Sequence, residues 1–274
     1  MIPDFTETAL TRLWSLDGRV AVVTGGGSGM GQATALRLAE AGAAVAVADI
    51  AADQAQETVD LIGKRTPDAR AVPLTVDVAD PASVRALGDE VIGRFGGIDI
   101  WVNTAWLSSS GGIADYPDEM WRQGLAVNLD GSFYTAREAA RRMLRAGRPG
   151  VIILVTSGSA HHGRARRYQY VAAKHGTLGL VKSLALELGP AGIRVVAIAP
   201  AATDTPGYRA APARFSGADA EQAKRLLDDT IAKMALGRLA QADDIARAAV
   251  FAASDMAGFI TGSTIHVDGG VDAT

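Results

Sequence analysis

The feature that most constrains the fold of this chain is the alternation of short, uniformly apolar runs with longer helical patterns. Runs rich in valine and isoleucine occupy residues 19–24, 44–49, 71–76, 98–102, 151–156, 193–199 and 263–267. Stretches with helical periodicity lie between them. Strands that are apolar on both faces and alternate with helices are typical of a parallel sheet covered on both sides, with right-handed connections. The sequence therefore predicts an α/β fold with a doubly wound parallel sheet of about seven strands and helices on both faces.

Two segments depart from this alternation. Residues 1–17 precede the first run and are interpreted as an N-terminal extension. Residues 201–220 contain too much proline, glycine and alanine for regular structure, and we expect a long loop of the kind that covers a binding site. No linker, repeat or low-complexity tract interrupts the rest. We therefore expect a single domain at residues 18–274, with a substrate lid at about 201–220.

The composition excludes several classes of protein. The absence of cysteine rules out disulfide scaffolds, zinc fingers, iron–sulfur clusters and thiol nucleophiles, and no carboxylate–histidine spacing indicates another metal site. A net charge of −3 gives no general attraction to nucleic acid or to an anionic membrane. No apolar stretch reaches the roughly 18 residues of a membrane span, and Asp4 and Glu7 stand where a signal peptide needs positive charge. We expect a soluble, cytoplasmic protein without nucleic-acid, membrane or metal partners.

The first apolar run ends in a glycine-rich turn, TGGGSGMG, at residues 24–31. Glycines at 25, 29 and 31 let the backbone turn tightly and approach a pyrophosphate, and the following helix would present its N-terminus to the phosphates. A purely structural turn is the alternative interpretation. The position of the turn after the first strand of an alternating pattern favours a dinucleotide site, and with it a Rossmann-type sheet.

The second apolar run ends at Asp49, 18 residues beyond Gly31. An acidic side chain at this place accepts hydrogen bonds from the adenosine ribose. It also repels a 2′-phosphate, and residues 50–52 offer no compensating base. The sequence therefore predicts NAD in preference to NADP, and the alternative is that Asp49 only caps the next helix.

Tyr170 and Lys174 are four residues apart at the start of a helical pattern, so both lie on one helical face. Lysine is scarce in this chain, and none of the other tyrosines has a lysine at this spacing. A free phenol has a pKa near 10, and a fixed ammonium beside it stabilises the phenolate. The pair is therefore a candidate for general acid/base chemistry, with an exposed surface pair as the alternative.

Further motifs follow in order along the chain. They are the Asp-Val pair at 77–78, the Asn-x-Ala segment at 103–105, Asn128 in VNLDG, Ser157 at the end of VTS, and the closing ITGSTIHVDGG. Together with the glycine turn (TGxxxGxG) and the Tyr-x-x-x-Lys pair, they make the chain from about Asp17 onward resemble the short-chain dehydrogenase/reductase family in its form of about 250 residues.

The resemblance implies roles for individual residues. Tyr170 would be the general acid/base, Lys174 would hold the nicotinamide ribose and lower the pKa of the tyrosine, and Ser157 would stabilise the substrate oxygen. Asn128, within a helical stretch at 118–145, would anchor a water that relays protons from Lys174; its alternative is a buried amide satisfied by the backbone. The residues expected at the cofactor are Gly25, Ser28, Gly29, Met30, Gly31, Asp49, Asp77, Val78, Asn103, Ala105, Tyr170, Lys174, Pro200, Thr203 and Thr205. Those expected at the substrate are Trp106, Ser159, Arg164 and Tyr208.

Two positions depart from the family pattern. Trp106 replaces a usual glycine, and it forms either an aromatic wall of the substrate pocket or a support packed beneath residues 107–116. Ala201 replaces the glycine that usually follows Pro200. Neither change touches the residues expected to be catalytic.

The segment between Ser157 and Tyr170 contains Arg164, Arg166 and Arg167. These arginines either clamp a carboxylate, sulfonate or phosphate of the substrate, or they are solvated or lie at a subunit contact.

The resemblance implies an NAD(H)-dependent oxidoreductase that interconverts a secondary alcohol and a ketone, and a homotetramer or homodimer. One alternative is a catalytically weak, nucleotide-binding regulatory protein on the same fold. A lyase or epimerase is disfavoured because the chain has a short lid and no second substrate domain.

Overall fold

The central feature of the computed structural model, which describes residues 5–216 and 219–273, is one parallel sheet with the strand order β3-β2-β1-β4-β5-β6-β9. Its strands are β1 (Val20–Thr24), β2 (Ala44–Asp49), β3 (Ala71–Thr75), β4 (Ile100–Asn103), β5 (Gly150–Val155), β6 (Ile193–Pro200) and β9 (Thr264–Val267). Every pairing in this sheet is parallel. The predicted fold class is confirmed, and the boundaries of the strands lie within two residues of those expected.

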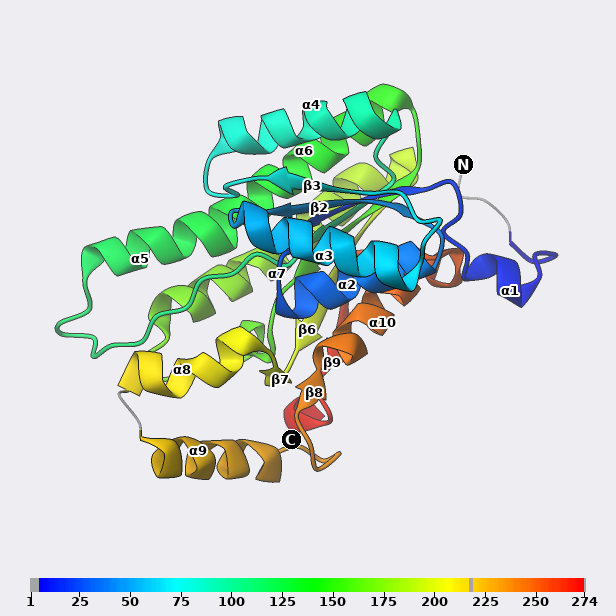
Figure 1. The fold of residues 1–274 in the computed structure, drawn as a ribbon. Coiled ribbons are helices and arrows are strands. Elements are labelled where there is room, and N and C mark those ends of the chain that lie inside the picture. Colours follow the sequence, from blue (N-terminus) through cyan, green and yellow to red (C-terminus); the bar gives the residue numbers. More distant parts are fainter. Residues whose placement is uncertain (1–4, 217–218, 274) are drawn as a thin grey trace.

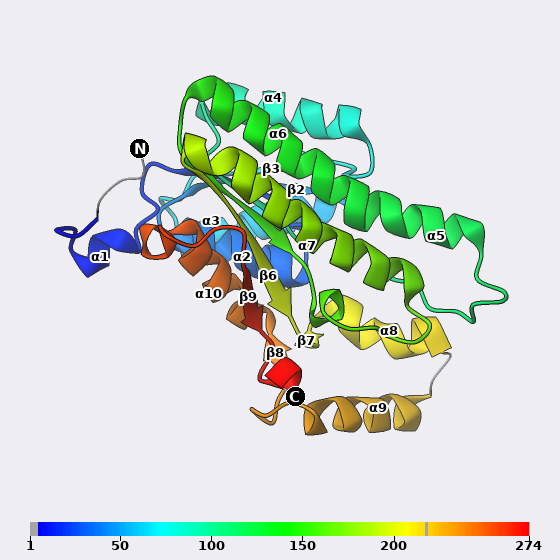
Figure 2. The same cartoon turned by 180° about the vertical axis from the view of Figure 1, so that it is seen from behind.

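Helices cover both faces of the sheet (Figures 1 and 2). One face carries α2 (Gly29–Glu40), α3 (Ala52–Arg65) and α10 (Ala242–Ala253), and the other carries α4 (Pro81–Phe95), α6 (Gly131–Ala146) and α7 (Tyr168–Leu188). Because the inner strands are apolar on both faces, the sheet divides the core into two buried layers. α5 (Asp118–Leu125) continues into α6 through a π-helical segment, Ala126–Asp130.

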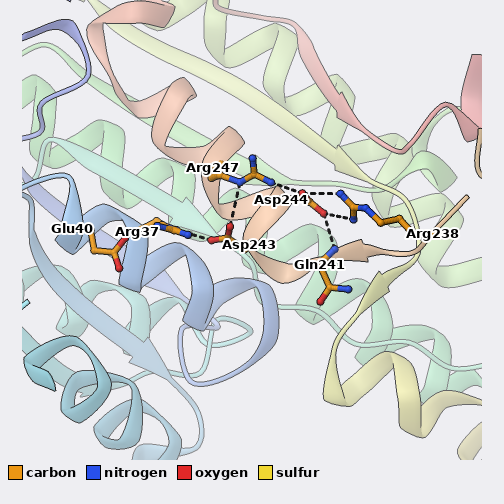
Figure 3. A network of polar contacts seen from close by, with 7 residues as sticks. All are labelled: Arg37, Glu40, Arg238, Gln241, Asp243, Asp244 and Arg247. Carbon is orange, nitrogen blue, oxygen red and sulfur yellow. Dashed lines mark hydrogen bonds and ion pairs between the residues drawn. The ribbon is translucent and has the colours of Figure 1, made fainter. Parts of the chain in front are cut away.

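Ion pairs join helices on the first face (Figure 3). Arg37 of α2 donates to Asp243 of α10 at 2.6 Å. Asp244 accepts from Arg238, Arg247 and the Gln241 N–H. This network fixes the start of α10 against α2 and against the chain that enters α10.

The expectation of irregular structure at 201–220 is wrong. β7 (Thr203–Asp204) pairs with β8 (Ala240–Gln241), and α8 (Pro206–Ser216) follows at once. Proline is favourable at the first position of a helix, and the alanines that follow favour helix over loop. Residues 217–218 lie outside the described residues, and α9 (Ala220–Ala232) comes next. α8 and α9 lie beyond the carboxyl end of β6 (Figure 2).

The predicted N-terminal extension contacts the rest of the fold in its described part. It contains a short helix, α1 (Leu10–Leu13). Leu16 is fully buried, its N–H donates to Ala41 O at 2.7 Å, and the Trp14 ring lies 6.0 Å from that of Phe251 on α10. Among the described residues, no helix is long and apolar enough to cross a membrane.

Candidate active site

The glycine turn between β1 and α2 is packed too closely for side chains. Gly25 has a φ of 75°, and a Cβ there would lie 2.7 Å from Ala105 N. At Gly31 a Cβ would lie 2.0 Å from the carbonyl oxygen of Gly25. Ser28, which precedes the first residue of α2, makes no side-chain capping hydrogen bond. The turn therefore leaves the N-terminus of α2 uncapped by a side chain, an arrangement suited to binding phosphate.

A cavity of about 340 Å³ lies against this turn, and we call it the loop cavity. It is lined by ten of the predicted cofactor residues: Gly25, Ser28, Gly29, Met30, Gly31, Asp49, Asp77, Val78, Ala105 and Thr205. Asn103 does not line it; its buried amide accepts from the Thr24 hydroxyl at 2.8 Å and donates to Ser132. The side chain of Asn103 thus ties β4 to β1 and α6.

Asp49 stands at the rim of the loop cavity, at the end of β2. Its Oδ2 accepts the Gly27 N–H at 2.9 Å, and its Oδ1 accepts the Ala51 N–H at 3.0 Å. The carboxylate therefore orients the glycine turn as well as the start of α3. The described residues that line this cavity include no lysine or arginine.

A second cavity of about 370 Å³ contains Tyr170, Lys174 and Ser157, and we call it the tyrosine cavity. It shares Met30, Thr104, Trp106 and Thr205 with the loop cavity, so the two spaces adjoin. The remaining predicted residues that line it are Ser159, Arg164, Pro200, Thr203 and Tyr208. The structure thus brings together residues from β5, α7, β6 and α8.

Lys174 is almost completely buried behind Tyr170. Its Nζ donates to Val155 O at 2.8 Å and lies 5.6 Å from the centre of the Tyr170 ring. Burial lowers the pKa of Lys174 to about 8. An ammonium in such a place exerts its charge through little water, so it acts strongly on nearby groups.

Tyr170 is subject to opposing influences. Desolvation of the phenol raises its pKa, whereas a hydrogen bond with Ser157 and the charges of Arg167 and Arg164 act in the opposite direction. Ser157 also accepts the Ser159 N–H at 3.1 Å, which orients its hydroxyl at the end of β5. Tyr170 and Ser157 therefore present two hydroxyl groups to one side of the cavity.

Asn128 lies in the π-helical segment between α5 and α6 and lines neither cavity. It is fully buried, its Nδ2 donates to Gly124 O and Leu107 O, and its Oδ1 accepts the Leu107 N–H at 3.1 Å. The backbone thus satisfies this amide, as the alternative interpretation of the sequence expected. The helix irregularity at Asn128 is present, and π-helical segments frequently occur at functional sites.

Trp106 lies between the two cavities and lines both. A Cβ added at Gly207, in the first turn of α8, would lie 2.9 Å from Trp106 Cζ2. The indole is 41% exposed, so it forms part of a wall and is not a buried support. Its position links the residues after β4 to α8.

Lys233, His162 and Asp272 line the tyrosine cavity and are not among the predicted site residues. Arg167, one of the arginines considered for an anion clamp, lines it as well. Lys233 follows α9 and Asp272 lies near the C-terminus, so neither carries a local motif that marks it as a site residue. His162 Nε2 lies 3.0 Å from Asp272 Oδ1.

The sequence predicted no metal site, but three potential ligands lie together beside this cavity. Ligand atoms of His266, Asp268 and Asp272 are within 4.8 Å of one another. Asp268 accepts the N–H groups of Gly270 and Asp272, at 3.1 Å in each case. These hydrogen bonds give Asp268 a structural part in the C-terminal turn.

Comparisons with known proteins agree with this geometry. Residues 25–272 match a family model described as enoyl-(acyl carrier protein) reductase. The chain is 38% identical over 256 residues to D-threitol dehydrogenase of Mycolicibacterium smegmatis, covering 93% of each chain. It is 37% identical over 258 residues to cis-4-hydroxycyclohexanecarboxylate dehydrogenase of Sinomonas cyclohexanicum, covering 93% of this chain and 97% of that one.

Solved structures show the same fold over nearly the whole chain. A short-chain type dehydrogenase/reductase from Mycobacterium marinum aligns with a TM-score of 0.85 and 33% identity, covering 96% of this chain and 99% of that one. A putative 2-deoxy-D-gluconate 3-dehydrogenase from Agrobacterium tumefaciens, solved with bound NADP, aligns with a TM-score of 0.83 and 36% identity, covering 95% and 99%. The ordered motifs, the sheet and these relatives together show that the chain belongs to the short-chain dehydrogenase/reductase family.

Proposed function

We propose that this protein is an NAD(H)-dependent oxidoreductase that interconverts a secondary alcohol and a ketone, with Tyr170 as the general acid/base. The observation that carries the proposal is the tyrosine cavity, which contains Tyr170, Lys174 and Ser157 and adjoins the loop cavity. Relatives named as dehydrogenases of a polyol and of a hydroxycyclohexanecarboxylate support an alcohol as the substrate class.

In this mechanism the chain supplies a proton acceptor and a positive field. Tyr170 accepts the hydroxyl proton of the alcohol as the carbonyl forms, and it returns that proton in the reverse direction. Ser157 donates a hydrogen bond to the substrate oxygen and stabilises the negative charge that develops there. Desolvation holds the pKa of Tyr170 above its ordinary value. The ammonium of Lys174, 5.6 Å from the centre of the Tyr170 ring, is proposed to favour the phenolate and so to oppose this effect.

The loop cavity fits a dinucleotide. Its wall is formed by backbone at Gly25, Gly29 and Gly31, where the chain leaves room for a phosphate to approach. When bound, the nicotinamide cofactor accepts or supplies the hydride. Asp49 at the rim, without a lysine or arginine among the described lining residues, supports NAD over NADP. Thr203 and Thr205 are proposed to contact the nicotinamide end, and Asp77 and Val78 the adenine end.

Further parts of the proposal concern organisation. We propose one catalytic domain at residues 18–274, in which the segment at about 201–220 covers the substrate through α8, and an N-terminal extension at residues 1–17. Family resemblance supports a homotetramer or homodimer in the cytoplasm. The exposed side of the site accepts a small molecule, with Trp106 and Tyr208 on its wall.

The decisive experiment is Tyr170→Phe. We expect turnover of alcohols to fall by about a thousandfold, because loss of a general acid/base costs roughly 10²–10⁴ in rate, while the dissociation constant for NADH changes less than about threefold. Turnover is followed by NADH absorbance and binding by fluorescence. Tyr134→Phe, on the exterior helix α6, is the matched control and retains wild-type rates. Undiminished activity of Tyr170→Phe would refute the mechanism.

The alternative is a catalytically weak, nucleotide-binding regulatory protein. It predicts NADH binding without turnover of any alcohol or ketone in a broad panel. The close arrangement of Ser157, Tyr170 and Lys174 favours the enzyme, because binding a nucleotide does not by itself require this group.

A further inference from the structure

We propose that the tyrosine cavity selects an alcohol that carries an anionic oxygen group, a carboxylate or a phosphate, at the end away from the reacting hydroxyl. Arg164 and Lys233 would bind this group. The inference deepens the proposed function, on which it rests, by naming the substrate class.

Positive side chains predominate around this cavity. Arg164, Arg167, Lys174 and Lys233 line it, and Asp272 is the one carboxylate among the described residues that do so. A cavity lined by charges of one sign concentrates ligands of the opposite sign. A neutral alcohol would leave Arg164 and Lys233 without an oppositely charged group among the described residues.

Asp272 offsets at most one of these four positive charges, and its carboxylate lies beside two histidines instead of Arg164 or Lys233. Its side chain is 9% exposed, and its Oδ1 lies 3.0 Å from His162 Nε2. Its Oδ2 lies 3.8 Å from His266 Nδ1. Within the part of the chain that the structure describes, neither Arg164 nor Lys233 forms an ion pair with a carboxylate.

The two arginines that line the cavity, Arg164 and Arg167, lie on either side of an unusual backbone turn. Arg166 has a φ of 65°, the one positive φ outside glycine among the described residues, and its carbonyl oxygen accepts the Gly111 N–H. In this conformation a residue other than glycine lowers the stability of the folded chain by about 1 kcal/mol or more. Across this turn Arg164 and Arg167 both line the cavity, whereas Arg166 does not.

Arg167 and Arg164 differ in what they can do for a ligand. Arg167 Nη1 donates to the buried Ser108 hydroxyl at 2.6 Å, and burial lowers the pKa of Arg167. This residue is therefore a fixed part of the wall near Tyr170. Arg164 is exposed, and Lys233 reaches the same cavity from the end of α9, so these two cations are positioned to bind an entering anion.

The rest of the wall suits an apolar middle section of the substrate. Met30, Trp106, Tyr208 and Met234 line the space around the reacting group and the cations. With a volume of about 370 Å³, the cavity has room for a small ring or short chain between a hydroxyl at Tyr170 and an anion at Arg164.

The test uses secondary alcohols that share one carbon skeleton and end in a carboxylate, a phosphate monoester or an uncharged methyl ester. We expect kcat/KM of the wild-type enzyme for an anionic member to exceed that for the ester by about tenfold or more, because hydrogen bonds to a charged group contribute that much. Comparing kcat/KM for the carboxylate substrate with that for the phosphate monoester shows which anionic group the site prefers. Arg164→Gln and Lys233→Gln should raise KM for the anionic members about tenfold and change kcat little, because the anion is bound equally before and during the reaction.

Two controls separate charge recognition from a structural effect. Arg166→Gln removes a charge from the same segment but outside the cavity, and it should leave the anion-to-ester ratio unchanged. Arg164→Lys keeps the charge and should restore most of the preference. This inference would be overturned if the wild type had equal kcat/KM for the anionic and ester members. It would also be overturned if the preference for anions survived in the double variant Arg164→Gln, Lys233→Gln. Either result would leave the alcohol dehydrogenase proposal intact. Failure of all members, charged and neutral, would instead refute the proposed function.

Discussion

At the scale of single residues, the burial that makes Lys174 an effective electrostatic partner also makes it costly to fold. Its pKa falls from 10.5 to about 8 because the ammonium is desolvated. Between these values the unfolded chain binds more protons than the folded one, so folding stability rises with pH across that window. Below about pH 8 the buried charge costs up to about 3 kcal/mol of unfolding free energy.

We therefore predict that Lys174→Met is inactive but more stable at pH 7 than the wild type. The expected gain is about 1 kcal/mol, because the cost of the buried charge disappears while Val155 O loses a hydrogen bond to a charged group, worth about 2 kcal/mol. The gain should shrink toward pH 10. Urea unfolding at pH 7 and pH 10 measures it, with the exposed Lys182→Met on the same helix as the control. A variant less stable than the wild type at pH 7 would contradict this reasoning.

Asp49 carries a second prediction at this scale. Asp49→Ala should reduce the ratio of kcat/KM for NAD to that for NADP by about tenfold, because it removes the carboxylate that we propose repels a 2′-phosphate and accepts hydrogen bonds from the ribose. The variant also loses the contact with Gly27, so affinity for both cofactors should weaken somewhat. Asp53→Ala, in the first turn of α3, is the control. A wild-type enzyme that already prefers NADP would rule out this role of Asp49.

At the scale of elements, the sequence predicts strands better than it predicts the elements around the substrate. The buried strands are recognisable because both of their faces are apolar, and the glycine turn is recognisable because its backbone approaches other backbone closely. The expectation of irregular structure at 201–220 is wrong because proline is tolerated in the first turn of a helix, and Pro206 stands at the first position of α8. Lys233 and Asp272 could not be predicted as site residues, because tertiary packing alone brings the end of α9 and the C-terminal turn to the cavity.

The contact between α8 and Trp106 yields a prediction for the lid. Gly207→Ala would place a Cβ 2.9 Å from Trp106 Cζ2, so the indole or α8 must shift. Because Trp106 borders both cavities, we expect KM for cofactor and substrate to rise about three- to tenfold with a smaller change in kcat. Steady-state kinetics and Trp fluorescence report the shift. Gly179→Ala, at a position on α7 with open space around it, should leave both KM values unchanged. Wild-type kinetics in Gly207→Ala would show that this contact does not position the lid.

At the scale of the whole molecule, one side of the fold presents apolar groups to solvent. Leu186 on α7 is 82% exposed and Phe259, before β9, is 94% exposed. A Cβ at Gly262 would lie 3.2 Å from Ala185 Cβ, which shows that the chain leading into β9 packs against the end of α7. β9 is also one of the two edge strands of the sheet, at the opposite end from β3. An open strand edge beside large exposed apolar side chains is a surface that proteins commonly cover by association.

We therefore expect the wild-type protein to form a dimer or tetramer in solution and to use this side as one contact. Replacing both Leu186 and Phe259 by lysine should shift the assembly to smaller species. Burying a charge at the interface costs more free energy than the lost apolar contact contributed to association. Sedimentation velocity at several concentrations measures the change, and the circular dichroism spectrum should remain that of the wild type. Leu10→Lys, at a site 61% exposed on α1, is the control and should leave the mass unaltered. A monomeric wild type, or a double variant with unchanged mass, would show that the exposed apolar groups on α7 and before β9 do not hold subunits together.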